Sequence, residues 1–127
     1  MAEDSARLDE LFVKHLRLFS RRPLPFGLEV HAGWADLLDT LLSRIETILH
    51  DIPDVSFEIL QVKEKFGTLR FYYRVGHAPD AAAAAIRQAV NATEEASRFC
   101  CERCVASGRL ATKDGWMRVR CRACDDD

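Results

Sequence analysis

The sequence predicts a mixed α+β domain that ends in a four-cysteine zinc ribbon. Two segments with apolar residues at helical spacing precede two alternating segments rich in β-branched and aromatic residues, and another helical segment follows. All five cysteines lie in the last quarter of the chain. We therefore expect two N-terminal helices, a β-hairpin, a third helix and a ribbon. At 127 residues this is one domain, with an α+β body (1–99) and a ribbon subdomain (100–124) packed on the third helix.

The first two helices follow from apolar stripes. The first is expected from about Ser5 to Ser20, with Asp4 or Ser5 as N-cap. Its stripe comprises Leu8, Leu11, Phe12, Leu16 and Phe19. "RRPLPFGLEVHAGW" contains two prolines and two glycines and is expected to be a loop. The second helix should run from about Ala35 to Leu49. Its wide stripe comprises Leu37, Leu38, Leu41, Leu42, Ile45, Ile48 and Leu49.

A β-hairpin is predicted next, because the apolar period changes from helical to alternating. Its strands are "VSFEILQVK" and "TLRFYYRV", joined by an "EKFG" link that places Gly67 at positive φ. In the second strand, Leu69, Phe71, Tyr73 and Val75 should share one face, and Thr68, Arg70, Tyr72 and Arg74 the other. Arg70 and Arg74 are expected to pair with Glu58 across the strands.

The third helix is expected from about Ala81 to Phe99, with Asp80 as N-cap and a run of five alanines that favours helix. Its buried stripe should comprise Ile86, Ala89, Val90, Thr93, Ala96 and Phe99.

The cysteines form two Cys-x-x-Cys pairs separated by sixteen residues, which is a common zinc-binding spacing. The expected ligands are Cys101, Cys104, Cys121 and Cys124, holding one Zn²⁺ ion in a tetrahedron. Between the pairs, "KDG" indicates a tight turn and "WMRVR" a strand. Four thiolates close the coordination sphere, so the metal should be structural.

The remaining cysteine and the four histidines are not expected to bind the metal. Cys100 could replace Cys101 only through a less usual three-residue gap, so we expect a small buried group or an idle thiol at the helix end. The four histidines are scattered over different segments and are expected at the surface or at helix ends. They are His15, His31, His50 and His77.

Several function classes are disfavoured. The sequence has no glycine-rich phosphate loop, no HExxH and no Ser-His-Asp order, and the adjacent Glu94 and Glu95 should splay apart, so we expect no enzyme. The apolar runs are too short to span a bilayer, so no membrane association is expected. "MAEDSARLDE" has no signal-peptide core, which predicts a cytoplasmic protein with reduced thiols.

The charge distribution leaves two kinds of partner open. Residues 1–97 carry fifteen acidic and eleven basic side chains, a net charge of −4. Residues 98–124 carry seven basic and two acidic side chains. Because four thiolates and Zn²⁺ sum to −2, that segment stands at +3, which the three final aspartates cancel. The balance favours a protein partner, bound through Arg70, Tyr72 and Arg74 or through an acidic helix face.

That acidic face would comprise Asp36, Asp39 and Glu46. Size and charge also suit a small immunity protein that neutralises a toxin, although this rests on analogy and on no motif. The alternative is a nucleic-acid-associated regulator that uses the arginines of the ribbon and of the hairpin.

Three stretches resemble a family of small bacterial and phage-encoded zinc-ribbon proteins. They are "HAGWADLLDTLLSRIE", "QVKEKFGTLRFYY" and "CERC…GRL…GWMRVRCRAC", and the similarity covers about residues 26–124. The hairpin motif "KEKFGxLRFY" is its most specific part. The resemblance implies zinc ligands at Cys101, Cys104, Cys121 and Cys124, and it implies no particular activity. Val105 departs from the glycine usual after the second cysteine.

Overall fold

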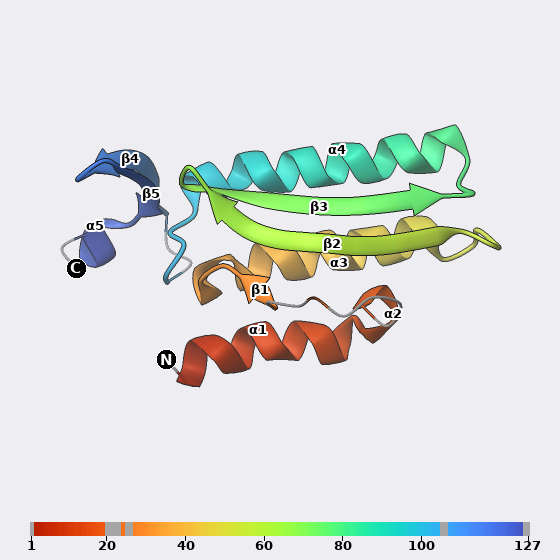
Figure 1. Ribbon diagram of the computed structural model, residues 1–127, viewed down its shortest axis with the longest axis horizontal. Coiled ribbons are helices and arrows are strands. Elements are labelled where there is room, and N and C mark those ends of the chain that lie inside the picture. Colours follow the sequence, from red (N-terminus) through yellow and green to blue (C-terminus); the bar gives the residue numbers. More distant parts are fainter. Residues whose placement is uncertain (1, 20–23, 25–26, 105–106, 126–127) are drawn as a thin grey trace.

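The chain has a mixed α+β architecture, as predicted (Figure 1). A computed structural model describes residues 2–19, 24, 27–104 and 107–125. Its elements are α1 (Ala2–Lys14), α2 (Leu16–Phe19), β1 (Leu28–Glu29), the 3₁₀ turn η1 (Ala32–Trp34), α3 (Ala35–Leu49), β2 (Ser56–Lys65), β3 (Thr68–Gly76), α4 (Asp80–Ala96), the 3₁₀ turn η2 (Ser97–Phe99), β4 (Arg109–Lys113), β5 (Trp116–Arg120) and α5 (Arg122–Asp125).

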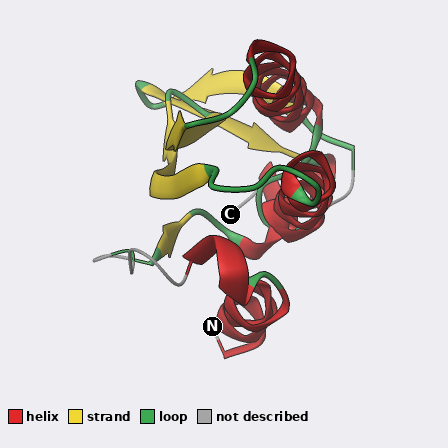
Figure 2. Ribbon diagram, turned by 90° about the vertical axis from the view of Figure 1, so that its right-hand side faces the viewer, coloured by secondary structure: helices red, strands yellow, loops and turns green. Residues whose placement is uncertain are grey.

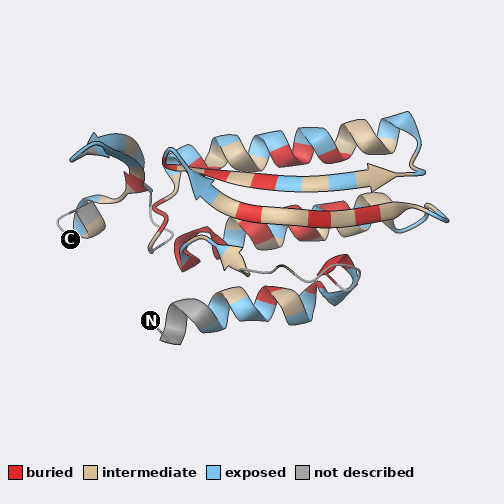
Figure 3. Ribbon diagram, in the orientation of Figure 1, coloured by how far each residue is buried: buried red, intermediate tan, exposed pale blue. Residues whose placement is uncertain are grey.

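The core lies between a three-stranded sheet, in the order β1-β2-β3, and the helices α3 and α4, which lie to one side of the strands (Figure 2). Buried residues follow the facing sides of these elements (Figure 3). The largest fully buried apolar side chains are Trp34, Leu38, Leu41, Leu42, Ile45, Ile59, Leu69 and Ile86. Each contributes about 1.5–3 kcal/mol through burial. The stripe predicted for residues 35–49 therefore supplies much of the core.

The N-terminal helix differs from its prediction. It begins at Ala2, so neither Asp4 nor Ser5 is its N-cap, and it breaks at His15 before the short helix α2. Because of this break, the predicted apolar stripe does not continue on one face: Phe19 is buried, but Leu16 is exposed. The expected end at Ser20 lies outside the described residues.

The predicted loop before α3 contains two short elements. Leu28 and Glu29 form β1, which pairs in parallel with Val62 and Lys63 of β2. Ala32–Trp34 form η1, which packs against the start of the cysteine-rich segment. A two-residue strand leaves too short a pattern for alternation to reveal it.

Strands β2 and β3 pair antiparallel through a two-residue turn at Phe66 and Gly67, shorter than the "EKFG" link expected. Gly67 has the predicted positive φ, at 83°, and Phe66 also has positive φ, at 54°. Positive φ at both positions is typical of a type I′ turn, whose twist matches that of the flanking strands. The register shifts between Ile59 and Gln61, which keeps Ile59 and Val62 both buried.

The faces of β3 follow the predicted alternation. Leu69 and Phe71 are buried, and Tyr72 and Arg74 are exposed on the other face. Arg74 lies opposite Glu58 and 3.9 Å from its carboxylate, as expected. Arg70 lies opposite Lys63, so its expected pairing with Glu58 is wrong.

Helix α4 covers the free edge of β3. The backbone amide of Leu69 donates to Ser97 Oγ (3.0 Å), and that of Phe71 donates to Glu94 Oε2 (2.8 Å). These bonds satisfy edge amides that would otherwise be open to another strand. Glu94 thus has a structural role that the sequence did not indicate.

The ends of α4 also differ from prediction. Asp80 is the first helical residue and Pro79 is the N-cap, which makes no side-chain capping bond but accepts the first helical hydrogen bond, from the backbone amide of Ala83, through its carbonyl oxygen. At the other end the helix tightens into η2 at Ser97. This change of period turns Phe99 outward, where it is 65% exposed, although the stripe predicted it to be buried.

Among the helices of the described residues, none has the length and apolar content that a bilayer crossing requires.

Candidate metal centre

Four thiols gather at the C-terminal end of the molecule. The sulfur atoms of Cys101, Cys104, Cys121 and Cys124 all lie within 4.8 Å of one another, and 3.4 Å separates those of Cys104 and Cys121. Sulfurs bound at ~2.3 Å in a tetrahedron are about 3.8 Å apart, so the cluster fits one ion. None of the five cysteines is in a disulfide. The structure thus brings together the four predicted ligands at a possible metal site.

The second pair of thiols is delivered by a hairpin. Strands β4 and β5 pair antiparallel from Arg109 opposite Arg120 to Lys113 opposite Trp116. Asp114 and Gly115 form its turn, with φ of 53° and 85°, which confirms the tight turn predicted from "KDG". Cys121 follows β5 directly, and Cys124 lies in α5.

The first pair is held by the body of the protein through η1. The backbone amide of Gly33 donates to the carbonyl oxygen of Glu102 (2.9 Å), and Trp34 Nε1 donates to the carbonyl oxygen of Cys100 (2.9 Å). A Cβ atom at Gly33 would overlap the backbone of Cys101 and Glu102. These contacts span almost seventy residues. The sequence reasoning missed them, although the adjacent Gly33 and Trp34 before a helix were the available signal.

A buried ion pair connects the first pair to β5. Arg120 Nε donates to Glu102 Oε1 at 2.8 Å, and both side chains are largely buried. The backbone amide of Glu102 also donates to the carbonyl oxygen of Val119 (3.1 Å). Glu102 therefore aligns the two halves of the cysteine cluster, whereas the sequence showed only an acidic residue among arginines.

The thiols have unequal proton affinities. Burial raises the pKa of the Cys101 thiol, but hydrogen bonds with the backbone at Cys121, Arg103 and Cys104 outweigh burial and lower it to about 7. Hydrogen bonds with the thiols of Cys121 and Cys104 raise the pKa of Cys124 to about 12. A metal ion would take the place of the protons that the sulfurs share, so its binding would release protons. A tetrahedral set of four sulfurs suits zinc or iron.

Cys100 lies outside this cluster, in agreement with the choice of Cys101 as first ligand. It is half-buried, and its Sγ lies 3.5 Å from the carbonyl oxygen of Gly33. Burial raises the pKa of its thiol, which keeps it protonated and unreactive at neutral pH. The irregularity expected at Val105 lies outside the described residues.

The acidic residues of α3 have partners within the chain. Asp36 forms an ion pair with Arg7 (2.5 Å), and Asp39 forms one with Lys14 (2.9 Å). The hydrogen bond with Lys14 is the largest of the effects that hold the pKa of Asp39 below its usual value. The expected acidic partner face therefore contributes to the docking of α1 on α3.

His15 contradicts the expectation of a surface histidine. Its side chain is 1% exposed, with Nδ1 2.5 Å from Glu46 and Nε2 2.6 Å from Asp39. Each ring nitrogen thus lies within hydrogen-bonding distance of a different carboxylate of α3. The other three histidines are exposed, as expected. The available signal was that Asp39 and Glu46 lie seven residues apart, and so on one face of the helix predicted for residues 35–49.

Comparisons with protein-family models, with curated proteins and with solved structures find no match. The resemblance to the zinc-ribbon family stays a prediction from the three motifs.

Proposed function

We propose that the chain is a non-enzymatic zinc protein in which the four-cysteine element shapes a surface for a protein partner. The observation that carries this proposal is a set of exposed apolar side chains where that element meets the body. Phe66 is 63% exposed at the tip of the β2–β3 hairpin, and Met117 is exposed on the adjacent strand β5. Phe99, in η2, adds a third exposed side chain on the segment that leads into the cysteines.

The metal is proposed to be one structural Zn²⁺ held by the four clustered cysteines. The support is the all-sulfur donor set and the spacing of the sulfurs. Four thiolates complete the tetrahedral coordination of zinc and leave no open position for a substrate or a water molecule. When bound, zinc would crosslink the two Cys-x-x-Cys segments and fix the β4–β5 hairpin on the body.

Two members of this set, Phe66 and Met117, line a groove of about 330 Å³, whose lining also includes Glu94 and Glu95. One wall comes from the body, through Phe66 and the end of α4, and the other comes from Leu110 and Met117 of the β4–β5 hairpin. Arg70 and Arg98 line it as well, and the Nε of Arg70 is buried with no partner among the described residues. Aromatic residues, methionine and arginine are the types enriched in protein interfaces. Of the three residues predicted to form a partner-binding face on the hairpin, Arg70 lines the groove, and Tyr72 and Arg74 lie further along the same strand.

The shape of this groove depends on the four-cysteine element. The tip of the β2–β3 hairpin packs closely on the β4–β5 hairpin, since a Cβ atom at Gly67 would lie 2.6 Å from Leu110 Cδ1 and 2.9 Å from the backbone of Arg118. Releasing the cysteines would let the β4–β5 wall move away. Partner binding should therefore require zinc. A toxin-neutralising protein of the immunity type is one form such a module takes, supported by size and charge alone.

The test is affinity purification from host lysate with two exposed apolar positions changed, Phe66→Asn and Met117→Gln. Asparagine tolerates the positive φ of residue 66, so the turn should persist. We expect a stoichiometric protein partner that the wild type retains and the double variant loses. Val13→Gln, on α1 and away from the groove, is the matched control because Val13 is 80% exposed.

Three results would overturn the proposal. They are the absence of any protein partner, equal retention by the double variant, and retention that persists after zinc is removed with a chelator. Light scattering of the purified chain distinguishes a second copy of itself as the occupant, which would also overturn it.

A further inference from the structure

A second surface lies on the side of the β4–β5 hairpin that faces away from the body. Residues directly opposite each other in an antiparallel pair share a face. The register therefore places Arg109, Ala111, Trp116 and Arg118 on one side, which we call the ribbon outer face. The other side carries the buried Val119 and the half-buried Leu110, which pack on the body.

The ribbon outer face is cationic, and no acidic residue of β4 or β5 opposes it. Arg109 lies opposite Arg120, a like-charge pair that weakens a hairpin. The buried carboxylate of Glu102 neutralises Arg120 and leaves Arg109 exposed to solvent.

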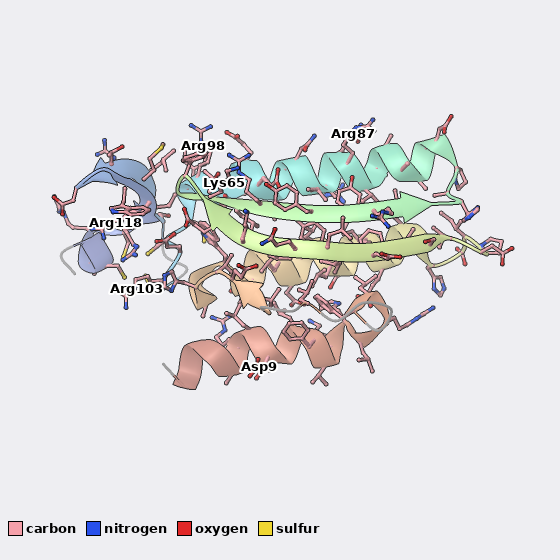
Figure 4. The ribbon with its side chains drawn as sticks, viewed as in Figure 1. Asp9, Lys65, Arg87, Arg98, Arg103 and Arg118 are labelled. Carbon is pink, nitrogen blue, oxygen red and sulfur yellow. The ribbon has the colours of Figure 1, made fainter. Side chains whose placement is uncertain are left out.

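The hairpin also separates its charge from the acidic body. Figure 1 shows β4, β5 and α5 at one end of the molecule, beyond the tip of the β2–β3 hairpin. Figure 4 shows Arg118 and Arg103 at this end beside a group of sulfur atoms, with Arg87 towards the other end of α4. Charges more than about 8 Å apart are largely screened at physiological salt. A polyanion at the ribbon outer face would thus meet the exposed Arg109 before the −4 of residues 1–97.

Trp116 identifies the kind of polyanion. It is 77% exposed on this face, next to the turn at Asp114 and Gly115. An indole open to solvent at the turn end of a face that also carries Arg109 provides a platform for an unpaired base, while the guanidinium group of Arg109 binds a phosphate. A base inside a duplex offers no free face to such a platform. We propose that the ribbon outer face binds single-stranded nucleic acid.

This site is independent of the proposed protein surface, because Phe66 and Met117 belong to the groove on the body side of the hairpin. The experiment measures the fluorescence anisotropy of a labelled 20-nucleotide oligothymidylate with zinc-loaded protein between 25 and 200 mM salt. If about three phosphates are contacted, log K should fall with log salt with a slope of about −2.

Two substitutions separate the contributions. Trp116→Ala should weaken binding about 10-fold, from the loss of one base stack. Arg109→Gln should reduce the magnitude of the salt slope by about 0.7, the value for one phosphate. Arg87→Gln, at an exposed position of α4, is the matched control and should leave binding unchanged. Zinc content and thermal unfolding of each variant confirm that the fold is retained.

No binding at 25 mM salt would overturn the inference. So would an unchanged affinity in Trp116→Ala, or an Arg87→Gln variant that weakens binding as much as Arg109→Gln. Poly-L-glutamate that competes as well per charge as oligothymidylate would assign the face to an acidic polypeptide instead. The Phe66→Asn, Met117→Gln variant should bind oligothymidylate like the wild type.

Discussion

Replacing Gly33 by alanine should separate the cysteine-rich segment from the body. The added Cβ would lie 2.5 Å from the carbonyl oxygen of Glu102 and closer still to that of Cys101. Real Cβ atoms do not make such contacts, and the obstructing atoms are backbone, so no rotamer change relieves the overlap. Either η1 or the Cys101–Glu102 segment must move.

The cost can be estimated from what that movement breaks. Overpacking a close contact costs roughly 1–3 kcal/mol, and a backbone clash lies at the upper end of that range. The hydrogen bonds from Gly33 to Glu102 and from Trp34 to Cys100 would lengthen or break, at about 1 kcal/mol each. We expect Gly33→Ala to lower the free energy of unfolding by about 3–5 kcal/mol.

Urea unfolding of the zinc-loaded protein, followed by tryptophan fluorescence, measures this loss. Trp34 is fully buried and should report the transition, while Trp116 is already exposed. Gly76→Ala is the matched control, because its Cβ would meet only Ser56 Cβ at 3.8 Å. Competition with a chromophoric chelator measures zinc affinity in parallel.

A free energy of unfolding for Gly33→Ala within about 0.5 kcal/mol of that for Gly76→Ala would contradict this prediction. A loss of stability that is equally large with and without zinc would contradict it as well. In that case the clash would be acting on the body alone and not on the junction with the cysteine cluster.

Three further predictions concern other residues. Cys121→Ser should abolish zinc binding and destabilise the chain, while Cys100→Ser should retain about one zinc per chain by metal analysis; equal zinc loss in both would show that the first ligand is misassigned. Glu102→Ala should cost about 3–5 kcal/mol in urea unfolding because it leaves Arg120 buried and unpaired, and a loss below 1 kcal/mol would contradict that account. The lowered pKa of Asp39 means that its folded-state interactions stabilise the protein above its unfolded pKa, near 3.8, and are lost as pH falls through the lower folded pKa. Asp39→Asn should therefore flatten the pH dependence of stability below about pH 4, and an unchanged acid limb would refute this.

Much of the fold follows from local sequence signals. The apolar stripe of α3, the positive φ of Gly67 and the Asp114–Gly115 turn each depend on residues close in the chain, and the structure contains all three. Prediction failed where an element changes period. At His15 and again at Ser97 the helix is interrupted, which exposes Leu16 and Phe99. No short-range pattern indicates such an interruption, because distant packing partners determine it.

The β2 strand gives a similar example. Strict alternation from Phe57 and Ile59 would place Gln61 on the core side and Val62 outside. The register shift between Ile59 and Gln61 reverses the alternation, so Val62 is buried and pairs with Phe71. Burial of valine against the core favours the shift, and that burial exists only once α3 and α4 are in place.

The sequence by itself determined which side chains gather at the possible metal site. Two residues between paired cysteines place both sulfurs on one side of a turn, and a hairpin with an Asp-Gly turn returns the second pair to the first. The tertiary structure alone decided where that cluster sits and what it faces. Gly33 and Trp34 meet the segment at Cys100 and Glu102 only after the helices and the sheet have assembled. Contacts across more than sixty residues depend on the packing of the whole core, and no local spacing encodes them.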